Sequence, residues 1–345
     1  MTSHKRQPFP FSAIVGQEDM KLAMILTAID PKIGGVLVFG DRGTGKSTAV
    51  RGLAALLPPI KAVAGCPVQS EKFEDCPVWA EIGSKRVVKR PTPVVDLPLG
   101  ASEDRVTGAL DIERALVRGE KAFEPGLLAS ANRGYLYIDE VNLLEDHIVD
   151  LLLDVAQSGE NLVEREGLSV RHDARFVLVG SGNPEEGELR PQLLDRFGLA
   201  VEVRSPRDVA TRVEVMRRRA GYEEDHDAFM TKWRRADGRL RAKIVRAKTA
   251  LADVATPEAA LTDCAEICIA LGADGVRGEL TLLRAAKALA AFEGDPEVSR
   301  AHLRRLSVPA LSHRLRRDPL DETGSSTRIL RQLGELFGPY QTAAE

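Results

Sequence analysis

Residues 40–47 place a lysine and a hydroxyl directly after a glycine-rich turn, in the pattern Gly-x-x-x-x-Gly-Lys-Ser. Glycines let the backbone turn back so that several N–H groups point at one anion. In this pattern Lys46 reaches the β- and γ-phosphates of a nucleotide, and the Ser47 hydroxyl is a ligand for Mg²⁺. The residues expected to bind the phosphates are Gly40, Asp41, Arg42, Gly43, Thr44, Gly45, Lys46, Ser47 and Thr48.

Such a loop needs a strand before it and a helix after it. Residues 36–39 form an apolar run that suits a strand buried on both faces. Apolar residues then recur at helical spacing from Lys46 until Pro58 and Pro59 end the helix. A glycine-rich turn without chemical meaning is the alternative, but the spacing, the strand and the helix all favour phosphate binding.

Two adjacent carboxylates, Asp139 and Glu140, end a second apolar run at residues 135–138, which is the form of a Walker B strand. Neighbouring side chains on a strand point to opposite sides. We therefore expect Asp139 to hold Mg²⁺, while Glu140 faces the γ-phosphate and deprotonates a water. An acidic strand end without a role is the alternative, and the phosphate loop upstream makes it the weaker one.

Three more polar residues are candidates for the same site. Asn183 lies at the carboxyl end of a strand predicted over residues 176–184, the end where open parallel sheets bind ligands, although an Asn before Pro is also a common turn residue. Arg196 lies in a predicted short helix before a strand at 199–203, and Arg277 lies at the start of a later helix. An ordinary salt bridge is the alternative for each arginine.

Composition limits the class of protein. A chain of 345 residues is long enough for two domains, with 43% hydrophobic and 29% charged residues as in ordinary globular proteins. With 48 basic and 51 acidic residues the net charge is −3, which offers no overall attraction to nucleic acid. No apolar run approaches the roughly 20 residues of a membrane span, and residues 1–10 lack a signal-peptide core. We expect a cytoplasmic protein without membrane insertion.

The cysteines and histidines do not indicate a metal site. Cys66 and Cys76 are spaced too widely for a zinc knuckle, and a redox pair is the less favoured alternative. Cys264 and Cys268 lie one turn apart in an apolar helix, where we expect them to be buried. The six histidines show no ligand spacing, so none is assigned to a metal.

The remaining patterns suggest insertions and a helical C-terminal part. Helical spacing over residues 103–117 is interrupted at 119–126, and alternation over 161–171 predicts a β-hairpin. After Ser205 a helix is expected with Val209, Val213 and Met216 facing inward, followed by a charged connector and then only helices. The expected domains are a nucleotide-binding α/β domain at 1–205, a connecting helix and charged linker at 206–238, and a helical lid at 239–345.

Together these motifs resemble the AAA+ superfamily and, more narrowly, the family of ATPase I subunits of magnesium chelatases. The most specific stretches are residues 9–17, 95–106, 123–140, 177–187 and 311–320, whereas 62–89 and 222–255 match poorly. The resemblance implies an α/β P-loop NTPase fold with a parallel five-stranded sheet of order 5-1-4-3-2 flanked by helices. It also implies helix-2 and pre-sensor-1 inserts and a C-terminal helical lid domain.

The resemblance also implies roles. Ile14 and Val15, with Gly16, are expected to cover the adenine ring, with plain packing as the alternative. Arg196 is expected to act as an arginine finger in a neighbouring subunit's site. Arg277 is expected to be a second sensor of the γ-phosphate, of its own nucleotide or a neighbour's.

The implied function is that of an ATP-hydrolysing motor subunit, using ATP and Mg²⁺, of a ligase that forms a nitrogen–metal bond in (bacterio)chlorophyll synthesis. The implied partners are further copies in a ring, expected to be hexameric, a D subunit, and an H subunit that carries protoporphyrin IX. Plant relatives begin with a transit peptide, which this sequence lacks, so a bacterial cytosolic form is expected. The alternatives are a MoxR-like AAA+ chaperone, a DNA-dependent helicase or transcription-activator ATPase, and a catalytically dead ring scaffold.

Overall fold

The computed structural model describes residues 7–41, 43–118, 121–165, 168–183, 194, 197–273, 275–315 and 325–338. By its internal contacts the chain divides into two compact units. The first comprises Met1–Gln17, Val38–Glu188 and Val203–Arg241, and the second comprises Glu18–Leu37, Leu189–Glu202 and Ala242–Glu345. The domain boundaries expected from the sequence, 1–205, 206–238 and 239–345, stay a prediction.

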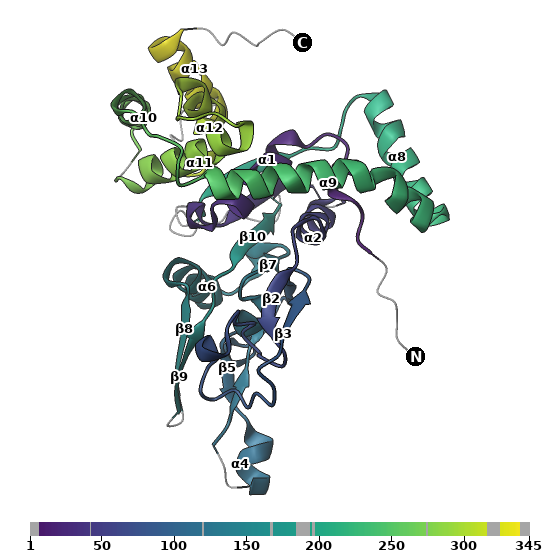
Figure 1. Ribbon diagram of the computed structural model, residues 1–345. Coiled ribbons are helices and arrows are strands. Elements are labelled where there is room, and N and C mark those ends of the chain that lie inside the picture. The colour runs from purple at the N-terminus through teal and green to yellow at the C-terminus, as the bar shows by residue number, and fades with distance from the viewer. Residues whose placement is uncertain are drawn as a thin grey trace. The chain divides into compact units, whose positions relative to one another are not determined.

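Five strands form the main sheet (Figure 1), in the order β11-β1-β10-β7-β4. They are β1 (Val36–Gly40), β4 (Val94–Leu97), β7 (Tyr135–Ile138), β10 (Val177–Gly182) and β11 (Leu199–Val203). Counted along the chain this is the order 5-1-4-3-2, so the expected topology is confirmed. β7 pairs in parallel with both β10 and β4, and every residue of β7 and β10 is buried, as their apolar composition requires.

Helices and short 3-10 turns complete the first unit around these strands. The helices of this part are α2 (Lys46–Leu56), α5 (Leu127–Ala131) and α6 (Asp146–Ser158), and the turns are η1 (Phe11–Ala13), η3 (Phe73–Asp75) and η4 (Val141–Leu143). A small antiparallel pair, β2 (Ile60–Val63) with β3 (Val87–Arg90), lies outside the main sheet.

Gly40, the last residue of β1, has φ +146°, a backbone conformation that other residues rarely adopt. A Cβ atom at Gly40 would lie 2.0 Å from the carbonyl oxygen of Val203, the last residue of β11. Only glycine therefore allows the close approach of the two backbones just before the phosphate loop.

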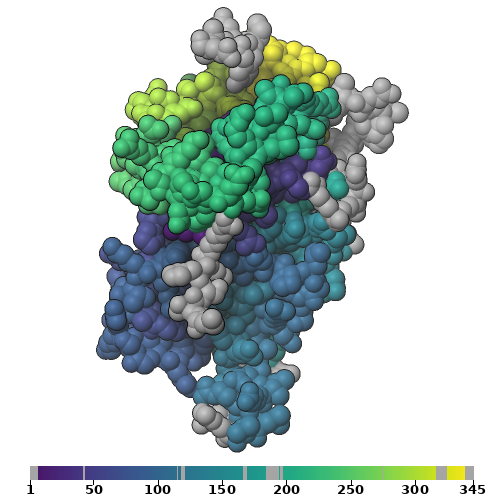
Figure 2. Space-filling view, turned by 90° about the vertical axis from the view of Figure 1, so that its right-hand side faces the viewer, coloured from purple at the N-terminus to yellow at the C-terminus, as the bar shows by residue number. Residues whose placement is uncertain are grey.

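Two insertions extend the first unit. The hairpin of β8 (Glu160–Arg165) and β9 (Leu168–Asp173) is antiparallel, so the hairpin predicted over 161–171 is confirmed. The other insertion runs through α3 (Glu103–Thr107), β5 (Gly108–Leu110), α4 (Ile112–Arg118) and β6 (Phe123–Pro125), with β5 and β6 paired. In Figures 1 and 2, α4 lies at the tip of this insertion, in blue.

The expectation of helical spacing throughout residues 103–117 was wrong in one place, because β5 separates α3 from α4. Gly108 ends α3 with φ +103°. A Cβ atom at Gly108 would lie 2.4 Å from the Phe123 ring on the partner strand, so the β5–β6 pairing needs glycine here.

The first unit ends with α8 (Val209–Glu224) and the start of α9 (His226–Ala250). The inward orientation expected for Val209, Val213 and Met216 was wrong: they are 73%, 38% and 62% exposed. Helix α8 contributes Tyr222 to the core instead, in a cluster with Ala13 and with Phe229 of α9. The charged linker expected after the connecting helix is itself largely helical, because aromatic residues at helical spacing anchor it despite its many charges.

The helices of the second unit are α1 (Glu18–Ile29), α10 (Glu258–Leu271), α11 (Arg277–Glu293), α12 (Arg300–Leu311) and α13 (Ser325–Phe337), with the short turn η2 (Pro31–Ile33). Gly272 and Gly294 end α10 and α11 in the left-handed conformation, as glycine commonly does after the last turn of a helix. Cys264 and Cys268 are buried in α10, as expected, and all four cysteines are free. No described helix is long and apolar enough to cross a membrane.

Candidate nucleotide-binding site

A cavity of about 500 Å³ lies in the first unit, where β1, β7 and β10 end. Its lining comprises residues 43–48 of the phosphate loop and α2, together with Tyr137, Asp139, Glu140, Gly182 and Asn183. The structure thus brings together the predicted loop, the two carboxylates and Asn183. Sequence reasoning missed Tyr137 and Gly182, which precede the predicted polar residues by one or two positions.

Lys46 is the buried cation of this cavity. Its Nζ lies 2.5 Å from the carbonyl oxygen of Gly40 and 3.2 Å from that of Asp41. Gly43 and Gly45 have φ values of +80° and +86°, which turn the loop ahead of α2. Gly45 is the residue before α2 and has no side chain to cap it, so this end of the helix presents the partial positive charge of the helix dipole toward the loop. Loop, lysine and helix end suit a polyanion such as a triphosphate.

The segment before α1 contacts the same loop. Gln17 has φ +57°, and its side-chain amide donates a hydrogen bond of 2.5 Å to the carbonyl oxygen of Thr44. Ile14 and Val15, the residues expected to cover adenine, are half-buried in this segment. Gln17 belongs to the stretch of residues 9–17 that carries the family resemblance, but no role was predicted for it. The available signal was a polar amide directly after a glycine, Gly16, which has φ +65° in the structure.

The two carboxylates are arranged differently from the simple strand alternation that we expected. β7 stops at Ile138, and Glu140 takes the left-handed conformation with φ +56° and ψ +60°. Both Asp139 and Glu140 line the one cavity. Asp139 Oδ1 accepts hydrogen bonds from Ser181 Oγ at 2.6 Å and from the Tyr137 hydroxyl at 3.0 Å. Burial raises the pKa of Tyr137, so its hydroxyl stays protonated and able to donate.

The donors fit magnesium as well as phosphate. Ser47 supplies a hydroxyl and Asp139 a carboxylate on the wall of one cavity, and oxygen atoms are the ligands that Mg²⁺ prefers. The observed loop, with its buried lysine, supplies the complementary charge for the nucleotide. The residues present therefore fit a magnesium nucleotide.

The predicted arginines are not part of this described cavity lining. Arg42 and Arg196 lie outside the described residues. Arg277 is the first residue of α11, in the second unit, which agrees with its predicted position at a helix start.

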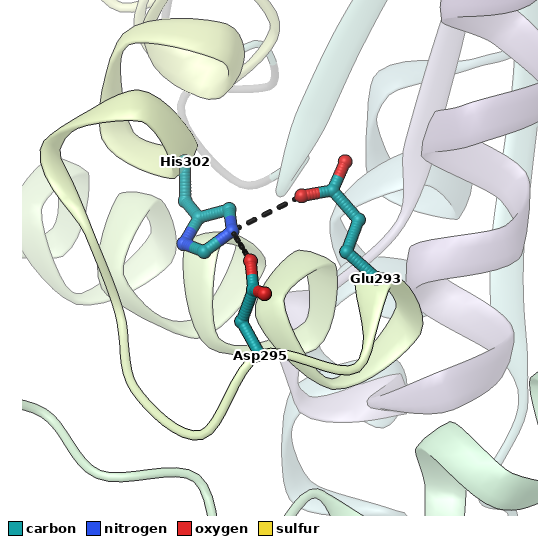
Figure 3. A group of neighbouring side chains, drawn as sticks. All are labelled: Glu293, Asp295 and His302. Carbon is teal, nitrogen blue, oxygen red and sulfur yellow. Dashed lines mark hydrogen bonds and ion pairs between the residues drawn. The ribbon is translucent and has the colours of Figure 1, made fainter.

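A group of possible metal ligands in the second unit has another explanation. The ligand atoms of Glu293, Asp295 and His302 all lie within 4.8 Å of one another (Figure 3). The backbone N–H of Ser299 donates to His302 Nδ1 at 3.0 Å, so the proton of the neutral ring belongs on Nε2. This Nε2–H then serves the carboxylates of Glu293 and Asp295, at 3.1 and 3.0 Å. We assign no metal to this cluster.

Comparison with known proteins agrees with the nucleotide-binding site described above and identifies the family. Residues 10–190 match the family model described as magnesium chelatase, subunit ChlI, and residues 261–333 match an AAA lid domain. The magnesium-chelatase 38 kDa subunits of Cereibacter sphaeroides and Rhodobacter capsulatus are 75% and 72% identical over 96% of this chain and over 99% and 95% of their own lengths. The magnesium-chelatase subunit ChlI of Synechocystis is 51% identical over 98% of this chain and 97% of its own.

Solved structures agree with the fold. One describes the complex between subunits BchI and BchD of magnesium chelatase, from a cryo-EM reconstruction at 7.5 Å. Its matching chain is 69% identical, with a TM-score of 0.58, covering 94% of this chain and 100% of that one. A second structure, of an ATPase from Cytophaga hutchinsonii, is 17% identical with a TM-score of 0.65. The match covers 93% of this chain and 90% of that one, and it supports the fold alone.

Proposed function

Because the chain belongs to the family of magnesium chelatase subunit ChlI, within the AAA+ ATPases, we propose that the cavity at the ends of β1, β7 and β10 binds and hydrolyses MgATP. The chain is the ATPase component of a chelatase, and the hydrolysis drives insertion of Mg²⁺ into protoporphyrin IX in (bacterio)chlorophyll synthesis. The observation that carries the proposal is the meeting of a buried lysine, a helix start and two carboxylates in one cavity.

Each residue has a defined task in this proposal. Lys46 and the loop N–H groups bind the phosphates, and Ser47 and Asp139 hold the magnesium ion of the nucleotide. The bound magnesium nucleotide supplies the phosphoryl group whose transfer to water releases free energy. Glu140 accepts the proton of the attacking water, and Asn183 orients that water or the γ-phosphate. Ile14 and Val15 cover the adenine ring.

The proposal extends to an assembly. The protein forms a ring of its own copies, of hexameric size, and acts with a D subunit and with an H subunit that carries the porphyrin. Support for the D subunit comes from the similar BchI chain, which was solved in a complex with BchD. Arg196 completes the neighbouring site as an arginine finger, and Arg277 senses the γ-phosphate. We place this assembly in the cytoplasm.

A MoxR-like chaperone is not favoured, because the relatives at 75% and 72% identity over 96% of the chain are chelatase subunits. The deciding experiment mixes the purified protein with D and H subunits, protoporphyrin IX, Mg²⁺ and ATP, and records Mg-porphyrin fluorescence. Product should form with the wild type and with Lys72→Ala, an exposed lysine, but not with Lys46→Ala. Metallation that proceeds equally without ATP would overturn the proposal.

A further inference from the structure

Strand β10 contains one hydroxyl side chain, that of Ser181, and its other five residues are apolar or glycine. Ser181 is only 1% exposed, in a strand whose six residues are all buried. A buried hydroxyl is costly unless its hydrogen bonds are made, so its partners indicate why it is present. The parallel register pairs Gly180 of β10 with Ile138 of β7, which places the following residues, Ser181 and Asp139, beside each other.

The hydroxyl of Ser181 forms hydrogen bonds with both residues of the acidic pair, Asp139 and Glu140. Its single proton goes to Asp139 Oδ1 at 2.6 Å. Its lone pairs accept the backbone N–H of Glu140 at 3.2 Å and face the Tyr137 hydroxyl at 3.3 Å. A serine hydroxyl has one donor and two acceptor positions. The donor and one acceptor position are engaged here, and the single proton of the Tyr137 hydroxyl is shared between Ser181 and Asp139.

The bond to Glu140 bears on backbone conformation. Glu140 adopts left-handed angles, which cost a residue with a side chain free energy and persist only where the surroundings hold them. Ser181 supplies such a constraint, because its oxygen accepts the N–H of the strained residue. One oxygen atom thus fixes the Asp139 side chain directly and the Glu140 side chain through its backbone.

We propose that Ser181 is a positioning residue that holds the magnesium-binding Asp139 and the base Glu140 in their relative arrangement, with the Tyr137 hydroxyl as an auxiliary donor. The inference rests on the proposed ATPase function, since it concerns how that site is organised. Nucleotide affinity without magnesium depends on Lys46 and the loop, whereas the hydrogen bonds of the Ser181 hydroxyl among the described residues go to Asp139, Glu140 and Tyr137. Loss of Ser181 should therefore weaken magnesium-dependent steps selectively.

The test compares four variants. Ser181→Ala removes every bond of the hydroxyl, Ser181→Thr retains the hydroxyl, and Tyr137→Phe removes only the auxiliary donor. Tyr135→Phe is the matched control, because the Tyr135 hydroxyl on the same strand is buried without a partner among the described residues. Measurements are binding of a fluorescent ATP analogue with and without Mg²⁺, the Mg²⁺ concentration for half-maximal ATPase activity, and amide hydrogen exchange at residues 139–141.

Ser181→Ala should raise the half-maximal Mg²⁺ concentration by about tenfold, the order expected for a lost hydrogen bond to a charged group. It should also speed exchange of the Glu140 amide and leave magnesium-free nucleotide binding within about twofold of wild type. Tyr137→Phe should raise the half-maximal Mg²⁺ concentration by a smaller factor. Ser181→Thr, which keeps the hydroxyl, should lie close to the wild type, and Tyr135→Phe should match it.

Two outcomes would overturn the inference. One is a Ser181→Ala protein whose magnesium dependence and Glu140 amide exchange match the wild type. The other is a loss of nucleotide affinity that is equally large with and without Mg²⁺. If Ser181→Ala does not fold, Tyr137→Phe decides between the same outcomes. A wild-type protein that binds and hydrolyses no ATP would instead contradict the proposed function, so the two failures are distinguishable.

Discussion

The side-chain amide of Gln17 donates a hydrogen bond to the carbonyl oxygen of Thr44 in the phosphate loop, over 2.5 Å. The bond joins the segment of Ile14 and Val15 to the loop that is proposed to hold the phosphates. The two ends of one nucleotide would then be bound by parts of the chain that constrain each other.

Gln17→Ala should weaken ATP binding two- to tenfold, because a neutral hydrogen bond contributes about 0.5–1.5 kcal/mol. Titration with a fluorescent ATP analogue measures the change. Gln332→Ala is the control, since this glutamine bonds Glu335 on the surface of α13. Equal affinities for the wild type and Gln17→Ala would show that the bond does not support nucleotide binding.

Lys46→Ala and Glu140→Gln should fail at different steps. Lys46→Ala should lose nucleotide binding, because the ammonium group is the buried cation of the loop. Glu140→Gln should bind MgATP with near-normal affinity and hydrolyse it about 10²- to 10⁴-fold more slowly, the usual contribution of a general base. Equilibrium binding and steady-state phosphate release separate the two effects, with the hairpin variant Glu164→Gln as the control. Near-normal hydrolysis by Glu140→Gln would remove this residue from the role of base.

Arg196→Ala subunits should inhibit rings that also contain wild-type subunits. An arginine finger supplied to a neighbour is worth about 10³- to 10⁵-fold in rate, so each mutant subunit disables an adjacent intact site. ATPase activity is measured while the fraction of mutant protein is raised, and Arg175→Ala, an exposed arginine, gives the reference curve. Activity strictly proportional to the wild-type fraction would contradict action between subunits.

His172 in β9 should make the fold sensitive to acid. Burial lowers its pKa, and its Nε2 lies 3.0 Å from the Asn161 amide nitrogen, which donates to a neutral ring. The stability gained from the neutral form is present above the unfolded-state pKa of about 6.5 and is lost as the pH falls through the lower folded-state value. The melting temperature should therefore fall more between about pH 7.5 and about pH 5 in the wild type than in His172→Gln. His147→Gln, at an exposed histidine, should follow the wild type.

Two glycines should respond oppositely to a methyl group. Gly238→Ala in α9 meets no atom within 4 Å and should stabilise the protein by about 0.5–1 kcal/mol, because alanine favours the helix. A Cβ atom at Gly134 would lie 2.3 Å from the Pro93 carbonyl oxygen, so Gly134→Ala should destabilise by about 1–3 kcal/mol. Thermal unfolding measures both, and a shift of the same sign in the two variants would contradict the packing argument.

The strands around the site were readable from the sequence, because the apolar runs that begin at residues 36, 135 and 176 are short and are followed by glycine or polar residues. The orientation of α8 was not readable. Val209, Val213 and Met216 have helical spacing, but spacing alone does not tell whether another element covers that face. In the same way, the aromatic anchors of α9 were hidden among its charges.

Ser181 could not be identified from sequence for a different reason. Its contact with Asp139 depends on the register between β7 and β10, which lie far apart along the chain. The left-handed turn at Glu140 is likewise accompanied by a hydrogen bond across strands, from its backbone N–H to Ser181 Oγ, which the local sequence does not indicate. The strand order itself came from the family resemblance, because periodicity does not specify which strands are neighbours.

The close approach of Gly40 to Val203 has a consequence for biosynthesis. β1, which leads into the phosphate loop, leaves the ribosome well before β11, so its flank stays open while most of the first unit is being translated. A nascent chain that ends ahead of β11 would carry the whole Gly-x-x-x-x-Gly-Lys-Ser motif and still lack the backbone against which the loop is set. Affinity for nucleotide should therefore emerge late in synthesis, after the last strand has entered the sheet.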